Sequence, residues 1–141
     1  MTETEPTAHH FGVTVTDLDR AVEFYNEVLG LDVLDRFSVS GEEFSKGVGV
    51  DGATGNFAHL DGGSARVELV EYDPEGDAHD TAHVNQPGAK HLGVAVDDLD
   101  RFYEELPSDV KMLSEPQTTA SGTTICFLRD PEGNLVELLE A

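Results

Sequence analysis

The chain has 141 residues, of which 38% are hydrophobic, so it is long enough to build one compact domain or two small modules that share a core. Eight Lys and Arg residues stand against 29 Asp and Glu residues, which gives a formal net charge of −21. A surface of that charge repels phosphate backbones and anionic lipids, so nucleic acids and membranes are not expected as partners.

The composition also predicts the cellular compartment of the protein. No segment approaches the run of about 20 apolar residues that a membrane span needs, and the acidic first residues lack the apolar stretch of a signal peptide. The single cysteine, Cys126, cannot form an internal disulfide and is expected in the core or in a sheet. We therefore expect a cytoplasmic protein. Because the carboxylates are spread along the whole chain, we also expect a halophilic protein that needs salt to screen its charge.

The first half of the chain predicts one helix and four strands. Residues 10–15 alternate between large apolar and small or polar side chains, as a half-buried strand does. Apolar residues then recur at helical spacing from Leu18 to Leu29, with Asp17 as the expected N-cap and Gly30 as the expected stop. Further strands are expected at roughly 32–40, 54–61 and 66–72, and the glycines between residues 41 and 63 predict loops and hairpins.

The second half predicts the same order of elements. A Pro-, Gly- and Asp-rich connector, residues 73–88, leads to a strand at 91–96 and a helix from Leu99 that Pro107 ends. Strands follow at 110–115, 122–129 and 135–141, the last after the turn signal Asp130-Pro-Glu-Gly-Asn. The chain is therefore expected to be a single α+β domain, residues 1–141, of two βαβββ modules that cover residues 8–72 and 89–141.

An internal repeat supports this division. The segment from His10 to Arg20 matches the segment from His91 to Arg101 at eight of eleven positions without a gap. The closing strands also match, because both contain Val-Glu-Leu followed by an aliphatic residue and Glu. Repeats of this kind indicate that one structural unit is present twice.

The repeat places a histidine and a glutamate at equivalent positions in each half. His10 and His91 are expected on the strand face opposite the large apolar residues, with small neighbours that leave open space beside the imidazole. Glu68 and Glu137 are expected on the same face of the closing strands. Two imidazoles and two carboxylates form a ligand set suited to one divalent ion, Zn, Ni, Co, Mn or Fe. We therefore predict His10, Glu68, His91 and Glu137 as metal ligands.

Other residues were weighed against these four. His9 is an alternative to His10, although the repeat aligns His10 with His91. Arg66 and Arg129 lie in strands and could reach the site, although surface salt bridges are the expected role of both. Three histidines fall outside the repeat and are expected either at the surface or in contact with a ligand: His59, His79 and His83.

The chain resembles a known superfamily over about residues 9–140. The resembling segments are His10…Val15-Thr-Asp-Leu, Phe24-Tyr-Asn-Glu-Val-Leu-Gly-Leu31, Val67-Glu-Leu, His91…Val96-Asp-Asp-Leu and Phe127-Leu-Arg-Asp-Pro-Glu-Gly-Asn-Leu-Val-Glu137. They resemble the vicinal oxygen chelate superfamily, which includes glyoxalase I, bleomycin-resistance proteins and dioxygenases, and they resemble glyoxalase I in particular. The resemblance implies two tandem βαβββ modules that form a cupped mixed sheet around a metal. It implies the same four ligands, and a homodimer with the site built within one chain or across two.

The resemblance also implies a reaction. A glutamate at position 68 is typical of the lyase and isomerase branch, whose members isomerise a 2-oxoaldehyde–thiol hemithioacetal to a 2-hydroxyacyl thioester. The metal acts as a Lewis acid and stabilises the enediolate that forms when a proton leaves carbon. The resemblance implies Glu137 as the main catalytic base and Glu68 as the catalytic partner that returns the proton or acts on the other face of the substrate.

The sequence leaves the substrate and two other functions open. Thr14 stands where bacterial glyoxalase I has an arginine that holds the thiol, and Tyr72 stands where it has an asparagine. Glutathione, another small thiol and no thiol therefore remain alternatives. The first other function is a different metalloenzyme on the same scaffold, an extradiol dioxygenase or a thiol transferase. The second is a protein without catalytic activity that sequesters a small molecule, as bleomycin-resistance proteins do.

Overall fold

A computed structural model describes residues 4–79 and 83–141. The chain divides into two compact units, Met1–Asp77 and Ala78–Ala141. Each unit contains its own mixed sheet, so the predicted α+β fold with two βαβββ modules is confirmed. Part of the connector expected at 73–88, residues 80–82, lies outside the described residues. In the described part of the chain, no helix is both long and apolar enough to cross a bilayer.

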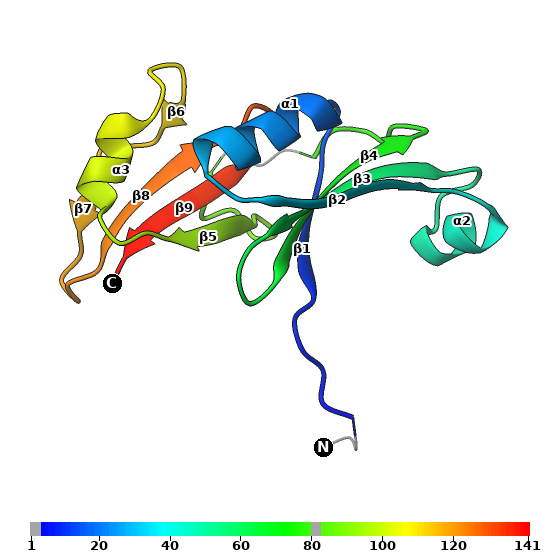
Figure 1. The fold of residues 1–141 in the computed structure, drawn as a ribbon, viewed down its shortest axis with the longest axis horizontal. Helices are drawn as coiled ribbons and strands as arrows, with labels where there is room; N and C mark the ends of the chain where they lie inside the picture. The colour runs from blue at the N-terminus through cyan, green and yellow to red at the C-terminus, as the bar shows by residue number, and fades with distance from the viewer. Residues whose placement is uncertain (1–3, 80–82) are drawn as a thin grey trace. The chain divides into compact units, whose positions relative to one another are not determined.

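The first unit is built on a four-stranded sheet (Figure 1). Its strands are β1 (His10–Thr14), β2 (Val33–Val39), β3 (Thr54–Asp61) and β4 (Arg66–Asp73). The strand order is β1-β4-β3-β2, with β1 parallel to β4 and the other pairs antiparallel. Helix α1 (Leu18–Glu23) continues as a π-helical segment, η1 (Phe24–Val28), and α2 (Glu42–Val48) connects β2 to β3.

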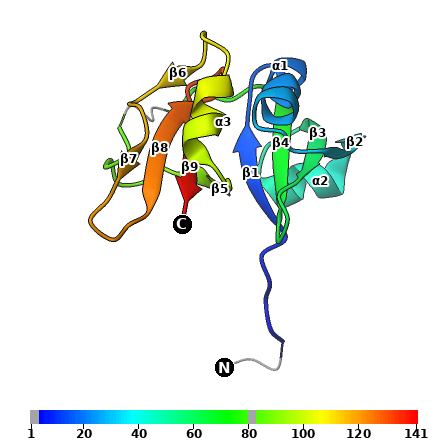
Figure 2. The ribbon, with the colours of Figure 1, turned by 60° about the vertical axis from the view of Figure 1, so that its left-hand side comes forward.

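The second unit repeats this plan (Figure 2). Strand β5 (His91–Ala95) is parallel to β9 (Leu135–Glu140), and β9 pairs with β8 (Thr124–Arg129) in the antiparallel sense. Helix α3 (Leu99–Glu105) contacts β9. Two short strands, β6 (Lys111–Met112) and β7 (Gln117–Thr118), both pair with β8. The strand expected at 110–115 is therefore shorter than predicted, and a second short strand follows it.

The helix starts agree with the prediction from sequence. The Asp17 side chain accepts a hydrogen bond from the backbone N–H of Arg20, and Asp98 accepts the equivalent bond from Arg101. Each aspartate thereby satisfies a backbone donor that has no partner inside the helix. Gly30 has a φ of +80°, which a residue with a side chain rarely adopts, so the predicted stop is also confirmed.

The core of each unit lies between its helix and one face of its sheet. Helix α1 contacts β3 and β4 of the first unit. Leu69 of β4 and Leu138 of β9 have no exposed surface, and burial of such a side chain contributes about 2 kcal/mol. The alternation predicted for the closing strands therefore holds, because these leucines point toward the helices and the neighbouring glutamates point away. Other buried core residues are Val13, Val15, Leu18, Ala21, Tyr25, Val67, Leu99, Cys126, Leu128 and Val136.

The prediction of loops between residues 41 and 52 was wrong over α2. Glu42–Val48 form a helix that begins after Gly41, at a φ of +109°, and ends at Gly49, at a φ of +74°. These glycines mark the two ends of a helix and not a hairpin. A helix of seven residues is too short for its apolar spacing to be recognised with confidence in sequence.

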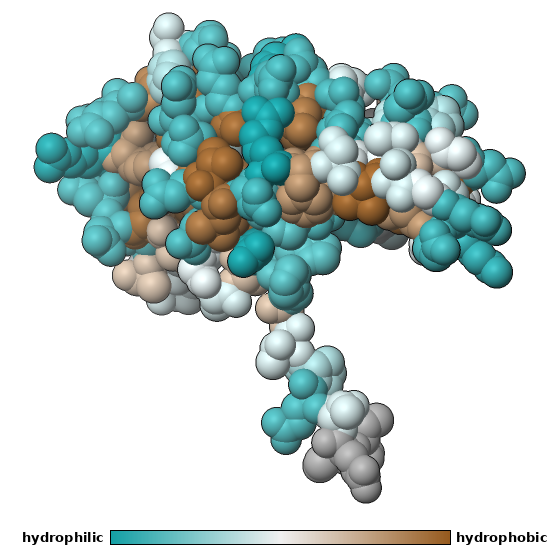
Figure 3. Space-filling view, turned by 45° about the vertical axis from the view of Figure 1, so that its right-hand side comes forward, coloured by the Kyte–Doolittle hydropathy of each residue, from teal (hydrophilic) through white to brown (hydrophobic). Residues whose placement is uncertain are grey.

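The surface is largely hydrophilic. On the face drawn in Figure 3, hydrophilic residues cover most of the area and hydrophobic residues lie exposed among them. This agrees with the excess of Asp and Glu over Lys and Arg.

Candidate functional site

The register of the first sheet brings His10 and Glu68 together. Gly12 of β1 lies opposite Glu68 of β4, and His10 precedes Gly12 by two residues, so it shares the same face. The His10 Nε2 and Glu68 Oε2 atoms are 3.5 Å apart. A Cβ at Gly12 would lie 3.8 Å from Glu68 Oε1 and 4.0 Å from His10 Cδ2. Gly12 therefore leaves the space in which the imidazole and the carboxylate meet.

The second unit builds the same pair. Gly93 of β5 lies opposite Glu137 of β9, and His91 precedes it by two residues. The His91 Nε2 and Glu137 Oε1 atoms are 3.3 Å apart. The histidine side chains are 39% and 41% exposed in the two units, and the glutamates are 15% and 21% exposed. Each unit therefore presents one imidazole and one carboxylate at the surface of its sheet.

His59 lies beside the pair in the first unit, in contact with the predicted ligand Glu68, which is one of the two positions expected for it. It lies on β3 opposite Glu68, and the residue as a whole is only 6% exposed. Its Nε2 is 2.7 Å from Glu68 Oε2, and Arg66 Nη1 donates to its Nδ1 at 3.2 Å. The surface position is therefore excluded for His59. Arg66 reaches the same face of the sheet through this contact, which agrees with the alternative to a surface salt bridge.

The place of His59 is taken by Phe127 in the second unit. Phe127 lies opposite Glu137 on β8, and its ring is 5.0 Å from that of His91 in an edge-to-face arrangement. Strands β3 and β8 lie outside the repeated sequence segments, and they differ at this position. One glutamate therefore has a hydrogen-bonding neighbour across the sheet and the other has an apolar one.

Two histidines border His10 on the sides that Gly12 does not face. The His9 Nδ1 and His10 Nδ1 atoms are 2.8 Å apart, and the rings of His10 and His59 stack at 5.9 Å between centroids. His9 thus contacts His10, and a direct role for it as a ligand stays an alternative. The contact with His59 was not predicted, because it comes from the neighbouring part of the sheet, strand β3.

An aromatic cluster continues along the same face of the first sheet. The Phe37 and Phe57 rings stack at 5.2 Å, and Phe44 of α2 stacks on Tyr72 at 6.3 Å. Burial raises the pKa of the Tyr72 phenol, and the negative charge of Glu68 raises it further. From sequence alone, Tyr72 is only a departure from glyoxalase I, because its contact with α2 was not predicted.

The structure does not bring every histidine to these pairs. His79 and His83 are exposed and lie outside the strands and helices. Within residues 4–79 and 83–141, no group of three or more His, Cys, Asp or Glu side chains is arranged to hold a metal ion. Each unit supplies two of the four predicted ligands, so the complete set stays a prediction.

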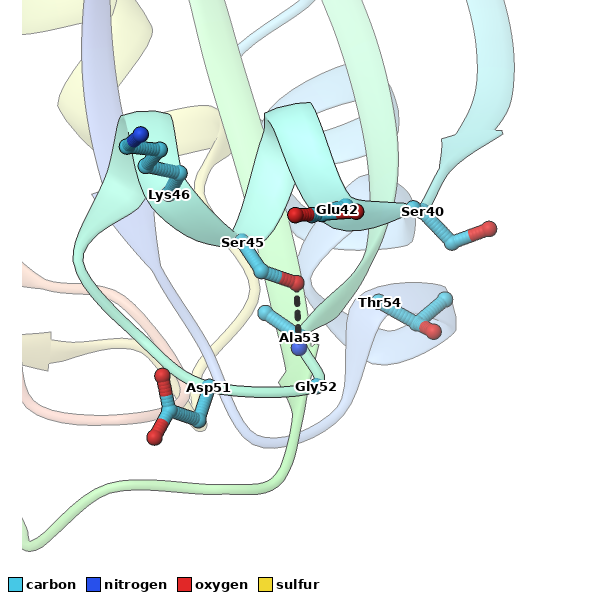
Figure 4. Close-up of a pocket in the computed structure, with 9 residues that line it drawn as sticks. Ser40, Glu42, Ser45, Lys46, Asp51, Gly52, Ala53 and Thr54 are labelled. Atoms are coloured by element: carbon cyan, nitrogen blue, oxygen red, sulfur yellow. Dashed lines mark hydrogen bonds between the residues drawn. The ribbon is translucent and has the colours of Figure 1, made fainter.

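A separate depression lies between α2 and the start of β3 (Figure 4). Ser45 Oγ accepts a hydrogen bond from the backbone N–H of Ala53 at 3.1 Å and fixes the loop that forms its wall. Lys46 and Asp51 are among its lining residues. It contains none of the four predicted metal ligands.

Comparison with known proteins gives consistent results. Residues 7–138 match the model of the Glyoxalase/Bleomycin resistance protein/Dioxygenase superfamily. Over 93% of its length the chain is 32% identical to a 2-epi-5-epi-valiolone epimerase from Actinomyces sp., of which it covers 77%. Over the same share it is 31% identical to a probable chloroplastic lactoylglutathione lyase from Arabidopsis thaliana, of which it spans only 35%.

A solved structure agrees with the fold. The chain matches a glyoxalase family protein from Bacillus cereus with a TM-score of 0.87 and 25% identity, covering 99% of this chain and 97% of that one. The family match extends over nearly the whole chain, and it includes both repeated His–Glu pairs. The chain belongs to the Glyoxalase/Bleomycin resistance protein/Dioxygenase superfamily.

Proposed function

We propose that the protein is a divalent-metal-dependent lyase or isomerase similar to glyoxalase I, which moves a proton between adjacent carbons next to a carbonyl group. One observation supports this most strongly. The same His–Glu pair is present in both units at the same register. Its glutamate lies opposite Gly12 in the first unit and opposite Gly93 in the second. A structural role in folding would not require both pairs to stand at the surface of the sheet.

The chemistry of these side chains fits a metal ion. The proposed ligands are His10, Glu68, His91 and Glu137, which would bind one ion within one chain or across two copies. Imidazole nitrogen and carboxylate oxygen suit first-row divalent ions such as Zn²⁺, Ni²⁺, Co²⁺, Mn²⁺ and Fe²⁺. When bound, such an ion supplies Lewis-acid polarisation of the substrate carbonyl.

Glu137 is the main base in this proposal, and Glu68 assists it from the metal site. Glu137 takes the proton from the carbon that bears the hydroxyl group, and the proton returns to the neighbouring carbon. No oxidant is needed, because one carbon is oxidised as the other is reduced. Phe127 lies opposite Glu137 on β8 and forms an apolar wall beside this carboxylate.

An epimerase is the second candidate, and the relative from Actinomyces sp. favours it. Epimerisation next to a carbonyl also begins with loss of a proton, which then returns to the same carbon from the other face. Thr14 replaces the arginine that holds the thiol in bacterial glyoxalase I, and Tyr72 replaces an asparagine, so a substrate without a thiol is compatible with this site. In both candidates Glu137 would remove the proton, and they differ in the carbon and the face to which a proton returns.

We propose a homodimer as the assembly. Strand β2 is the edge of its sheet, and its exposed apolar side chains include Val33, Leu34 and Phe37. An exposed apolar edge strand is a site at which chains associate. Light scattering coupled to size-exclusion chromatography gives the mass directly, and a monomer at micromolar concentration would contradict this assignment.

One set of measurements tests the proposed function. The metal content of the purified protein is determined first, and we expect about one divalent ion per four-ligand site. Methylglyoxal hemithioacetals of several thiols are then assayed for thioester formation in the presence of each candidate metal. Exchange of substrate C–H for deuterium in D₂O detects proton removal whether the product is an isomer or an epimer.

The rival functions have their own outcomes. Oxygen uptake with catechols and Fe²⁺, without hydrogen exchange, would identify a dioxygenase. Binding of a small molecule by a protein that holds no metal would identify a sequestering protein. Either result replaces the proposed function.

A further inference from the structure

We infer that His59 is a positioning residue that fixes Glu68 as a permanent metal ligand, while Glu137 remains free to move the proton. The inference rests on the proposed function and goes further, because it separates the roles of two glutamates that the repeat makes equivalent. It depends on the hydrogen bonds of His59 and on the residue that replaces it in the second unit.

The hydrogen bonds of His59 determine its tautomer. A guanidinium group only donates, so the contact of 3.2 Å from Arg66 Nη1 requires Nδ1 of His59 to be an acceptor. The remaining proton of a neutral imidazole is then on Nε2. From there it is donated to Glu68 Oε2 at 2.7 Å. Arg66 thus orients the imidazole, and His59 orients the carboxylate.

Burial makes this arrangement rigid. The His59 side chain is 8% exposed and that of Glu68 is 15% exposed, so water competes little for the hydrogen bond. The Phe37 ring packs edge-to-face against His59 at 5.2 Å between centroids and limits rotation of the imidazole. Because Oε2 of Glu68 accepts the hydrogen bond from His59, Oε1 is the oxygen that remains available to bind a metal ion. The Oε1 atom lies over Gly12, where the absence of a side chain keeps it accessible.

In the second unit, the residue opposite the glutamate is not a histidine. Phe127 stands opposite Glu137 at the register position that His59 occupies opposite Glu68. A phenyl ring has no hydrogen to donate to the carboxylate, so Glu137 keeps the rotational freedom that proton transfer between two carbons needs. The difference between His59 and Phe127 therefore makes Glu68 the fixed metal ligand and Glu137 the base.

The tautomer is tested first, in the protein without added metal. Long-range ¹H–¹⁵N correlation spectra distinguish the two neutral tautomers of His59, and we expect the proton on Nε2. Replacement of Arg66 by Met removes the donor to Nδ1 and should let the other tautomer become populated. A proton on Nδ1 in the unaltered protein would overturn the inference without any bearing on the proposed reaction.

Metal affinity is tested next, by calorimetric titration with Zn²⁺ and with Ni²⁺. His59→Phe makes the first unit like the second, and we expect metal affinity to fall about 10- to 100-fold. His59→Gln retains a donor and should stay within a few-fold of the unaltered protein. His83→Phe, at an exposed position, is the matched control.

The outcomes separate the two levels of the argument. If the unaltered protein binds no divalent ion, the proposed function fails, whereas the tautomer experiment still decides the arrangement around His59. If it binds metal and His59→Phe binds equally well, the inference fails and the proposed function stands. If His59→Phe does not fold, His59→Gln and Arg66→Met in the same titration decide, since loss of affinity in the former alone would contradict the inference.

Discussion

The backbone N–H of Leu18 donates a hydrogen bond to Oε2 of Glu71 at 2.8 Å, which ties the first residue of α1 to β4. The second unit has the same bond, from Leu99 to Glu140 Oε1 at 2.8 Å. Glu71 and Glu140 are the final residues of the repeated five-residue pattern, Val-Glu-Leu followed by an aliphatic residue and Glu. Each closing strand therefore has one glutamate on the site face and another, three residues later, that holds the start of the helix on the opposite face.

Removal of either helix-holding glutamate should lower stability and leave the site intact. Glu71→Ala and Glu140→Ala each leave a partly buried N–H without its acceptor, and we expect a loss of about 1–2 kcal/mol in the free energy of unfolding. Urea denaturation followed by circular dichroism measures it. Glu115→Ala, at an exposed loop position, is the control and should change stability by less than about 0.5 kcal/mol. Equal effects of Glu71→Ala and the control would contradict the capping role.

Glu137→Gln should separate catalysis from folding. The amide keeps the shape of the carboxylate but cannot accept the proton, so we expect kcat to fall by roughly 10²- to 10⁴-fold with the fold and some metal binding retained. Glu68→Gln should instead act mainly through metal affinity. Steady-state kinetics at saturating metal distinguish the two variants. An undiminished kcat in Glu137→Gln would show that another group is the base.

Stability should rise with salt concentration. At a net charge of −21 the folded chain repels itself, and screening becomes short-ranged only at high ionic strength. Exposed ion pairs such as Arg36–Asp19 and Arg101–Glu105 offset little of this repulsion. Thermal unfolding at about 10 mM and at molar KCl, with NaCl as a second salt, measures the effect. A fold that is unchanged at 10 mM salt would contradict the halophilic assignment.

Tyr72 should ionise at higher pH than an ordinary tyrosine. Ionisation creates a negative charge, which both burial and the charge of Glu68 disfavour, so its pKa lies above the usual value of 10.0. Absorbance titration near 295 nm, compared with Tyr72→Phe, identifies its contribution among three tyrosines. Glu68→Gln should lower this pKa, as should a divalent ion bound at Glu68. A titration that Glu68→Gln leaves unaltered would exclude the coupling.

Local patterns explain which parts of this structure could be predicted from sequence. The strand alternation around Val13 and Leu69, and the cap at Asp17, depend on neighbours within a few residues, so one sequence is enough to find them. The His–Glu pairs could be placed on one face because the repeat supplied the correspondence between distant strands. Whether all four ligands meet depends on how the two units combine, which no local pattern specifies.

The role of His59 could not be predicted in this way. Its contact with Glu68 depends on the register of β3 against β4, and a shift of one residue would point its side chain to the other face. The repeat gave no help, because Phe127 occupies the equivalent position. Helix α2 was missed for a different reason: its seven residues include Gly47 and span less than two turns of apolar pattern.

Position 12, a glycine, can accept only a small side chain. A methyl group at this position would only touch the Glu68 carboxylate and the His10 ring, at ordinary contact distances of 3.8 and 4.0 Å. Every atom beyond it would occupy the volume above the strand that these two side chains share. Random mutagenesis of position 12 should therefore recover alanine among functional clones and reject branched or aromatic residues, even though the backbone there is ordinary extended strand.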